Sequence, residues 1–386
     1  MLVGAAMLTS ITLQNFKSFG EEQTVPLRPI TAIVGPNNSG KSNLVSLARF
    51  VRNVVDAGFD QAIEAEGGER FAFHRPSVED GRVYISWSSN EGRYHTSVFP
   101  DLGLQKDEEL HSTEQGDAWE TEQEAGSIQR LYRMTFSHSK KKPLQIDAFM
   151  PLSGLAAVMR LDSQEAEPFR RIVTPLVRAR EIKLQLSVLR QDAEVVPEPR
   201  LGSDGSGLAS VLGLWRGSDP DRAEQLHEFI RRCLPEIRHV FVKPSPSPAH
   251  QRLWVQQNDG EQFDADHVSD GVLFFLALAM HAVEAQPGSI LFVEEPEQCI
   301  HPRRVGMIME LFRQVVAQRG CQVVVVTHSP VLLNELRDEP ESIVLFRRGD
   351  QGTRVKQLTE MPHLIDALRD AEPGEMLANG FFDAAF

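Results

Sequence analysis

The last third of the chain alternates short, fully apolar runs with longer segments of helical length. The runs at 289–293 and 321–327 each contain four consecutive apolar residues, which is typical of strands buried on both faces. Two segments have helical patterns: 270–284 precedes the first apolar run, and 302–317 lies between the two runs. This alternation predicts a parallel sheet covered by helices, which the apolar run at 30–34 joins.

The first half of the chain has a different, alternating pattern. Residues 8–19 alternate apolar and polar side chains, and 22–27 can return as a hairpin partner, which predicts an antiparallel β-layer. Further alternating segments favour an antiparallel meander, at 82–87, 94–99, 130–136 and 144–149. Beyond it the pattern predicts helices at 153–181, 208–215 and 221–233, and strands at 182–190, 239–243 and 251–256.

An acidic stretch interrupts the meander at about 104–126. It has many carboxylates and almost no aliphatic side chains, so burial cannot offset the entropy of ordering it. We therefore predict a mobile loop there. A functional acidic segment or DNA mimic is the alternative interpretation.

The composition narrows the class of protein. With 386 residues, 41% of them hydrophobic, the chain can bury a large core. The longest apolar run, 272–280, falls short of the roughly 20 residues that a membrane helix needs. Residues 1–7 lack a basic secretory n-region, and Met7 could equally be the natural start, so we expect a cytoplasmic protein without membrane contact. The three cysteines form no C-x-x-C pair and are expected to be buried thiols.

A net charge of −14 argues against wholesale coating of nucleic acid. One basic cluster nevertheless stands out, and its residues are Arg170, Arg171, Arg178 and Arg180, with Lys140–Lys142 nearby. Such a cluster either binds nucleic acid or is simply a solvated helix face.

Residues Gly35 to Ser42 follow the apolar run 30–34 and precede a helical pattern. Their spacing, G-x-x-x-x-G-K-[ST], is that of a phosphate-binding P-loop, in which the glycines let backbone N–H groups point at the phosphates. Lys41 would meet the β- and γ-phosphates and Ser42 would meet Mg²⁺. A chance glycine turn is the alternative.

Polar side chains follow the two apolar runs of the predicted parallel sheet. Glu294 and Glu295 end the first run, where open α/β sheets place their ligands. One carboxylate can hold Mg²⁺ and the other can accept a proton from water. His328 follows the second run and is either a γ-phosphate sensor or a structural histidine.

A Ser-Asp-Gly motif at 269–271 begins the apolar helix 270–284. Ser269 is a good N-cap for this helix. A helix N-terminus with serine and glycine is also an anion site, which could meet a nucleotide bound to another subunit.

In chain order the four motifs are the P-loop, the Ser-Asp-Gly motif, the apolar strand that ends in Glu294 and Glu295, and the strand that ends before His328. Together they resemble those of the ABC-type ATPase heads of the RecF, SMC and OLD (overcoming-lysogenization-defect) families. The nearest likeness is to the AAA-type ATPases of bacterial defence and toxin–antitoxin loci. It rests on 13–19 before the P-loop, Glu295-Pro-Glu297 with His301-Pro302, and Ser-Asp-Gly in place of Ser-Gly-Gly. It covers 8–50 and 263–350 well and the middle only loosely.

The resemblance implies an α/β fold: a P-loop ABC-ATPase head with a mixed, mainly parallel core sheet and an N-terminal antiparallel β-layer. We expect the ATPase core at 1–60 and 235–386, and an inserted β-meander and helical subdomain at 61–234. By the same resemblance, ATP is bound with Mg²⁺ by Gly35, Pro36, Asn37, Asn38, Ser39, Gly40, Lys41, Ser42 and Asn43.

The resemblance also assigns chemistry to the remaining motifs. Glu294 becomes the Walker B acid that holds Mg²⁺ with Ser42, Glu295 the general base and His328 the switch histidine. Ser269 and Gly271 would act in trans on the γ-phosphate of a partner head, so that a homodimer sandwiches two ATPs. Two features depart from the pattern: Glu294 stands where many relatives have Asp, and the Q-loop glutamine has only Gln185 and Gln191 as candidates.

The expected function is an ATPase that switches between open and ATP-clamped dimers, in an anti-phage defence or toxin-type system. Only about 60 residues follow His328, too few for the TOPRIM nuclease of many OLD-like proteins, so we expect a separate effector protein to carry any nuclease activity. The alternative is a RecF-like DNA-binding repair ATPase that uses the basic cluster. A transporter subunit is disfavoured by the Ser-Asp-Gly motif, and an SMC-type tether by the missing coiled coil.

Overall fold

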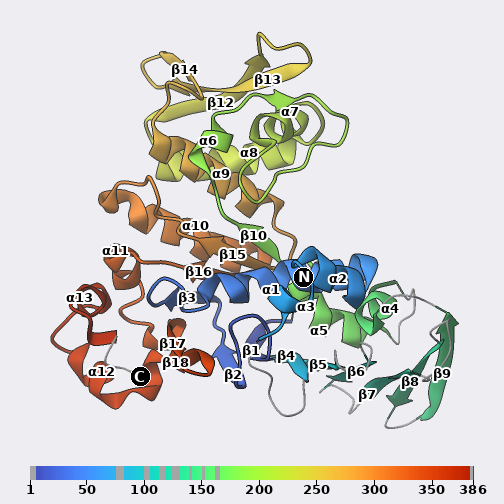
Figure 1. The fold of residues 1–386 in the computed structure, drawn as a ribbon. Coiled ribbons are helices and arrows are strands. Elements are labelled where there is room, and N and C mark those ends of the chain that lie inside the picture. Colours follow the sequence, from blue (N-terminus) through green and yellow to red (C-terminus); the bar gives the residue numbers. More distant parts are fainter. Residues whose placement is uncertain are drawn as a thin grey trace.

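A six-stranded sheet lies at the centre of the computed structural model (Figure 1). The structure describes residues 6–74, 82–99, 105–112, 118–123, 131–138, 141–149, 153–160, 166–382 and 386. From edge to edge the strands are β10 (Arg180–Ile182), β15 (Ile290–Glu294), β16 (Gln322–Val326), β3 (Ile30–Val34), β17 (Ile343–Gly349) and β18 (Gly352–Gln357). All neighbours are parallel except β18, which pairs antiparallel with β17. The mixed, mainly parallel sheet is as predicted.

Both faces of this sheet are buried, which explains why its strands are apolar throughout. On β15, Leu291 and Val293 belong to one apolar core, whereas Phe292 between them belongs to a second core on the other face. Val323 and Val324 of β16 divide in the same way. Successive side chains of a strand point to opposite faces, so a strand between two cores has no polar face.

An eight-stranded antiparallel sheet lies on one side of the central sheet (Figure 1). Its strands, in spatial order, are β2 (Gln23–Pro26), β1 (Leu8–Gln14), β4 (Val83–Ser89), β5 (Gly92–Phe99), β6 (Gln105–Ser112), β7 (Ala118–Gln123), β8 (Leu131–His138) and β9 (Lys141–Phe149). The predicted N-terminal hairpin and meander are therefore confirmed, and they form one continuous sheet.

Helices fill the space between these two sheets. Val51 of α1 and Ile172 of α5 share one apolar core with Ile85 of β4 and Phe292 of β15. The helices on this side are α1 (Lys41–Ala57), α2 (Phe59–Ala65), α3 (Glu69–Ala72), α4 (Gly154–Arg160) and α5 (Glu167–Val177). The P-loop helix α1 is thus held between the two sheets.

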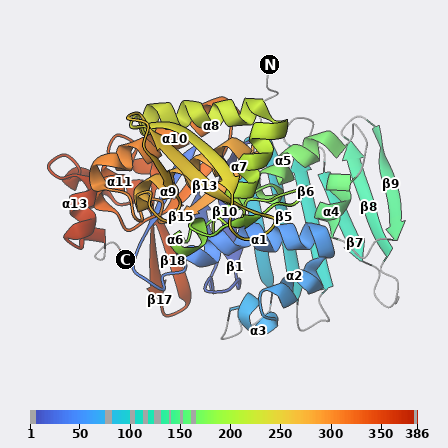
Figure 2. The same ribbon diagram turned by 90° about the horizontal axis from the view of Figure 1, so that it is seen from above.

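The opposite face of the central sheet is covered by helices and a small third sheet, seen at the top of Figure 1 and from above in Figure 2. The helices are α6 (Leu186–Leu189), α7 (Leu208–Ser218), α8 (Pro220–Cys233), α9 (Asp270–Glu284) and α10 (Val305–Arg319). The strands are β11 (Ala193–Glu194), β12 (Ile237–Pro244), β13 (His250–Gln257) and β14 (Gln262–Asp264). Helix α9 is buried along nearly its whole length, which explains its uniformly apolar sequence.

Short helices complete the C-terminal part beside β17 and β18. They are α11 (Pro330–Asn334), α12 (Pro362–Ala367) and α13 (Pro373–Ala378), with single 3₁₀ turns at η3 (Pro302–Arg304), η4 (Pro340–Ser342) and η5 (Leu358–Glu360). The predicted helix 302–317 therefore begins as a 3₁₀ turn and continues as α10.

The predicted loop at 104–126 is wrong for two segments, which form β6 and β7. Glu108 in β6 is buried, and its carboxylate accepts hydrogen bonds from the Tyr94 hydroxyl (2.8 Å) and the Gly154 N–H (2.5 Å). A carboxylate that accepts hydrogen bonds from neighbouring elements can be buried, so the acidic composition of this stretch did not mean a solvated loop. The remaining residues of this stretch, 104, 113–117 and 124–126, lie outside the described residues.

Two further expectations need correction. The predicted strand 182–190 is wrong beyond Ile182, because the chain leaves the sheet and forms α6 at 186–189. Cys299 is exposed rather than buried, since it lies in the turn that follows β15, whereas Cys233 and Cys321 are buried. In addition, β10 lies within the range predicted as inserted, 61–234, yet pairs with β15 of the core sheet.

Candidate functional site

The P-loop connects β3 to α1, and close backbone approaches fix its shape. Gly40 has a left-handed φ of 101°, and a Cβ there would lie 2.1 Å from the Thr353 hydroxyl oxygen. At Gly35 a Cβ would lie 2.0 Å from the carbonyl oxygen of Phe346 on β17. The Thr353 hydroxyl also donates to the Ser39 carbonyl (2.9 Å). Glycine is therefore required at both positions, and the β17–β18 hairpin supports the loop.

The Lys41 side chain folds back over the loop that it follows. Its ammonium donates to the carbonyls of Gly35 (2.6 Å) and Pro36 (2.7 Å). Burial lowers the pKa of Lys41, and the charges of Glu295 and Glu294 oppose that shift. The Lys41 ammonium is thus held against the loop backbone, near the charges of two carboxylates.

Ser42 and Glu294 meet although 251 residues separate them in sequence. The Ser42 hydroxyl donates to Glu294 Oε2 at 3.2 Å, and Glu294 is the last residue of β15. A hydroxyl and a carboxylate oxygen on adjacent elements are ligands of the type that Mg²⁺ prefers. The residues present therefore fit the magnesium ion that the motif predicts.

Glu295 and His328 lie at the same edge of the central sheet. Glu295 has a left-handed φ of 48°, and its N–H donates to the Val326 carbonyl (2.8 Å), which turns the chain as it leaves β15. Burial, followed by the charge of Lys41, lowers the pKa of His328. A neutral imidazole is therefore expected at neutral pH.

One cavity of about 270 Å³ is lined by most of these predicted residues, although not by Gly35 and Pro36. Its lining comes from the P-loop and from the ends of β15 and β16: Asn37, Asn38, Ser39, Gly40, Lys41, Ser42, Asn43, Glu294, Glu295, Val326 and His328. Three separate parts of the sequence thus converge on it. The geometry suits a phosphate group bound by backbone amides and one cation, with adjacent carboxylates that could hold a divalent ion.

Ser269 and Gly271 line a different cavity, of about 540 Å³, together with residues that follow β15 such as Cys299 and His301. Ser269 occupies the N-cap position of α9, but its side chain makes no capping hydrogen bond. None of the P-loop residues lines this second cavity. Within one chain, the Ser-Asp-Gly motif and the P-loop therefore line two separate cavities.

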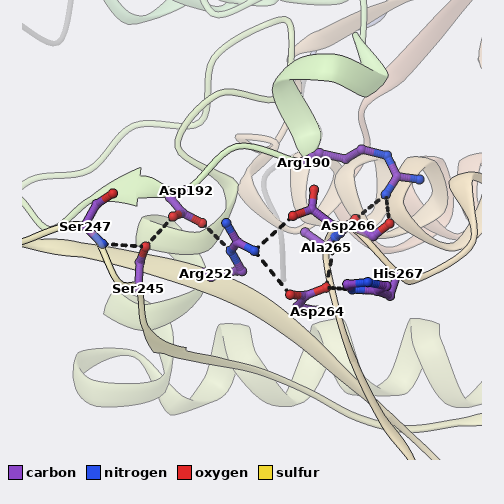
Figure 3. A network of polar contacts seen from close by, with 9 residues as sticks. All are labelled: Arg190, Asp192, Ser245, Ser247, Arg252, Asp264, Ala265, Asp266 and His267. Atoms are coloured by element: carbon purple, nitrogen blue, oxygen red, sulfur yellow. Dashed lines mark hydrogen bonds and ion pairs between the residues drawn. The ribbon is translucent and has the colours of Figure 1, made fainter.

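A polar network supports the loop that precedes the Ser-Asp-Gly motif (Figure 3). Arg252 on β13 donates to the carboxylates of Asp192 (2.5 Å), Asp264 (3.2 Å) and Asp266 (2.9 Å). The hydrogen bond from Arg252 lowers the pKa of Asp192. Arg190 donates to the carbonyls of Ala265 and Asp266, both at 2.6 Å. These contacts fix the loop 264–268 from two sides.

Three residues near the site were given no role there from the sequence. The Lys183 ammonium donates to Glu294 Oε2 (2.9 Å), Arg190 binds the loop before α9, and Glu297 accepts a hydrogen bond from the Thr327 hydroxyl (2.6 Å). Gln185 and Gln191, the predicted Q-loop candidates, do not line the P-loop cavity. The signal that could have found Lys183 is its place directly after β10, but that strand has only three residues.

Most arginines of the basic cluster lie close to acidic side chains. Arg170 and Arg171 lie near Glu167, with N–O distances of 3.4 and 3.7 Å. Arg180 donates to Glu284 at 2.6 Å. Arg178 is exposed, and Lys140 lies outside the described residues. Three of the four arginines thus face carboxylates, and a nucleic-acid role for the cluster stays a prediction.

Comparison with known proteins gives matches over most of the chain. A family described as "AAA domain, putative AbiEii toxin, Type IV TA system" matches residues 176–334, and an AAA ATPase domain family matches residues 7–117. The OLD nuclease of Thermus scotoductus is 22% identical over 368 residues, covering 89% of this chain. This chain spans 63% of that protein's length.

Two solved structures share the fold. A crystal structure of the SMC head bound to the C-winged helix domain of ScpA has a TM-score of 0.55 at 13% identity, covering 90% of this chain and 97% of the solved one. A Pyrococcus furiosus SMC head domain, with an extended coiled coil and bound to the C-terminal domain of ScpA, has a TM-score of 0.53 at 11% identity, covering 95% and 100%.

Fold and matches together define a P-loop ATPase with the architecture of an SMC head. More narrowly, the matches make the chain similar to ABC-type ATPases of the OLD and SMC kind. Among the residues that the structure describes, no helix has the length and apolarity needed to cross a membrane.

Proposed function

We propose that this ATPase binds ATP with Mg²⁺ in the P-loop cavity and uses the nucleotide as a dimerisation switch. The observation that supports the proposal is the convergence of Lys41, Ser42, Glu294, Glu295 and His328 on that one cavity. The amides of the loop Gly35–Asn43 hold the phosphates, and Lys41 pairs with the β- and γ-phosphates. Ser42 and Glu294 would hold Mg²⁺, which would neutralise phosphate charge.

In this proposal the remaining two side chains carry the proton chemistry and sense the γ-phosphate. Glu295 accepts a proton from the water that attacks the γ-phosphate. His328 donates a hydrogen bond from its neutral ring to a γ-phosphate oxygen. Its lowered pKa fits this assignment, because a neutral imidazole can donate without adding a second full charge beside Lys41.

We further propose that each ATP is completed by a second chain. The separate cavity of Ser269 and Gly271 supports this, because the N-terminus of α9 is available to another subunit's γ-phosphate. A head-to-tail dimer brings that motif against the P-loop of the partner. Loss of the γ-phosphate would remove the ligand that both chains share, and the dimer would open.

A mixing experiment tests both proposals with ATP turnover as the readout. Lys41→Ala and Ser269→Arg are each expected to abolish turnover. A mixture of the two variants should regain turnover, because a mixed dimer contains one site with an intact P-loop and an intact partner motif. Unchanged turnover in Lys41→Ala would refute the ATP site, whereas a mixture that stays inactive would refute the composite dimer.

For the cellular role, we propose an anti-phage or toxin-type system that acts with a separate effector subunit. The match to a putative AbiEii toxin family and the likeness to an OLD nuclease support this assignment. The test is plating efficiency of a phage panel on cells that carry the native locus, compared with cells carrying Lys41→Ala. DNA or RNA cleavage by the purified chain alone, independent of Lys41, would contradict the separate effector.

A further inference from the structure

Lys183 directly follows β10 and contacts Glu294, one of the residues that line the P-loop cavity. Because β10 runs parallel to β15 with Ile182 opposite Val293, the next residues on both strands, Lys183 and Glu294, emerge side by side. The Lys183 ammonium donates to Glu294 Oε2 at 2.9 Å. The same oxygen accepts the Ser42 hydroxyl at 3.2 Å. One carboxylate oxygen thus binds an ammonium and the P-loop serine together.

The backbone of Lys183 is held by a hydrogen bond, whereas its side chain is largely exposed to solvent. The Lys183 N–H donates to the Ser203 carbonyl (2.8 Å), and the next residue, Leu184, is buried. The Lys183 side chain is 58% exposed, whereas that of Glu294 is only 10% exposed. The ammonium can therefore leave Glu294 by rotation of its own side chain, without any change in the fold.

The carboxylate oxygen that Lys183 contacts belongs to Glu294, a proposed ligand of Mg²⁺. Ser42 and Glu294 are the ligands proposed above, and a divalent ion between them would lie against the ammonium as a like charge. A purely structural ion pair is the alternative, but an ion pair with one end so exposed contributes little to stability. The neighbouring Glu181 is already paired with Arg49 (3.3 Å).

We propose that Lys183 is a positioning residue that occupies the cation position beside Glu294 until Mg²⁺ displaces it. The inference deepens the proposed function and rests on it. Without nucleotide, the ammonium keeps Glu294 oriented toward Ser42 and weakens the binding of free divalent ions. Mg²⁺ that arrives with ATP brings phosphate ligands that free Mg²⁺ lacks, so only the complex completes the exchange.

The test is a titration of the purified full chain with Mn²⁺, without nucleotide, followed by electron paramagnetic resonance of the free ion. Lys183→Met should bind Mn²⁺ about tenfold more tightly than the wild type, the effect of removing a unit charge from a partly hydrated site. Lys183→Arg retains the charge and should stay near the wild type. Lys243→Met removes the same charge on β12, whose residues do not line this cavity, and should have no effect.

The outcomes separate this inference from the proposed function. Circular dichroism first establishes that each variant is folded. Equal or weaker Mn²⁺ binding by Lys183→Met, including the case in which no protein binds Mn²⁺, overturns the inference. Binding of a fluorescent ATP analogue, lost in Lys41→Ala, reports on the proposed function separately. A protein that binds the analogue while Lys183→Met leaves Mn²⁺ affinity unchanged would keep the ATP site and reject the displacement.

Discussion

The guanidinium of Arg190 donates a hydrogen bond to the carboxylate of Asp270, with an N–O distance of 2.5 Å. Asp270 is the first residue of α9 and the centre of the Ser-Asp-Gly motif. Arg190 ends the short segment that begins with Lys183 at the P-loop cavity. This ion pair therefore joins the edge of the nucleotide cavity to the motif proposed to bind a partner's ATP.

Replacing Arg190 should uncouple those two regions. Arg190→Met removes the ion pair and the bonds to the Ala265 and Asp266 carbonyls, so the loop before α9 loses a fixed position. We expect ATP affinity of the P-loop to be unchanged and turnover to fall about tenfold, a loss of about 1.4 kcal/mol in transition-state stabilisation. Fluorescent-ATP binding and phosphate release measure the two effects.

Arg231→Met is the matched control, because Arg231 forms an exposed ion pair with Glu224 on α8. This control should change neither the ATP affinity nor the turnover. Turnover of Arg190→Met equal to that of the wild type would show that the motif is positioned without this arginine. A parallel loss of ATP affinity would instead show that Arg190 supports the P-loop cavity of its own chain.

Gln322 should be a strong determinant of stability. Its buried side-chain amide accepts from the Leu8 N–H (2.6 Å) and donates to the carbonyls of Leu8 (2.8 Å) and Arg28 (3.3 Å), which ties β1 to β16. Gln322→Leu continues the apolar run but leaves buried backbone groups without partners. We expect a loss of about 2–4 kcal/mol in the free energy of unfolding.

Chemical denaturation measures this loss, and Gln318→Leu on the exposed face of α10 is the control. The control should change the free energy of unfolding by less than about 0.5 kcal/mol. If Gln322→Leu is as stable as the control, the amide network does not hold the antiparallel sheet to the core.

The elements that could be predicted from sequence are those whose residue pattern lies within one short stretch of the chain. The buried strands β15 and β16 are apolar because both faces are covered, and the P-loop spacing lies within eight residues. Lys183 could not be placed, because β10 is a three-residue edge strand recognised only by its pairing with β15, more than 100 residues later. The burial of Glu108 could not be predicted, because its partners lie on the neighbouring strand β5 and on helix α4.

Removing Lys41 should raise the pKa of His328. Burial makes the larger contribution to the lowered pKa, and the Lys41 charge makes the next. In Lys41→Met the imidazolium no longer faces that ammonium, so the pKa should move part of the way back toward 6.5. Histidine-selective NMR titration follows this change, and His328→Gln identifies the signal among the 12 histidines.

Lys183→Met is the control for this titration, because Lys183 is not among the charges that shift the pKa of His328. It should leave the titration of His328 where it is in the wild type. An unchanged His328 pKa in Lys41→Met would mean that burial alone sets it, and that the lysine and the histidine do not share the cavity in solution.

Glu297 should make the stability of the protein fall as pH rises. Its Oε1 accepts from the Thr327 hydroxyl (2.6 Å) and the His328 N–H (3.3 Å), while its buried Oε2 contacts no donor within the described part of the chain. Burial raises the pKa of Glu297 above 4.5, and the hydrogen bonds only partly oppose the shift. The native state therefore binds this proton more tightly than the unfolded state does.

This difference in proton binding sets the direction in which stability changes with pH. The contribution of Glu297 is fully present below pH 4.5 and is lost as the pH rises through the folded pKa. Glu297→Gln keeps the accepting oxygen and cannot ionise, so its melting temperature should exceed that of the wild type at pH 7.5, by about 2 °C. The difference should vanish toward pH 4.5, whereas the exposed control Glu261→Gln should show no such trend. A difference that is independent of pH would show that Glu297 is not protonated more readily in the folded protein.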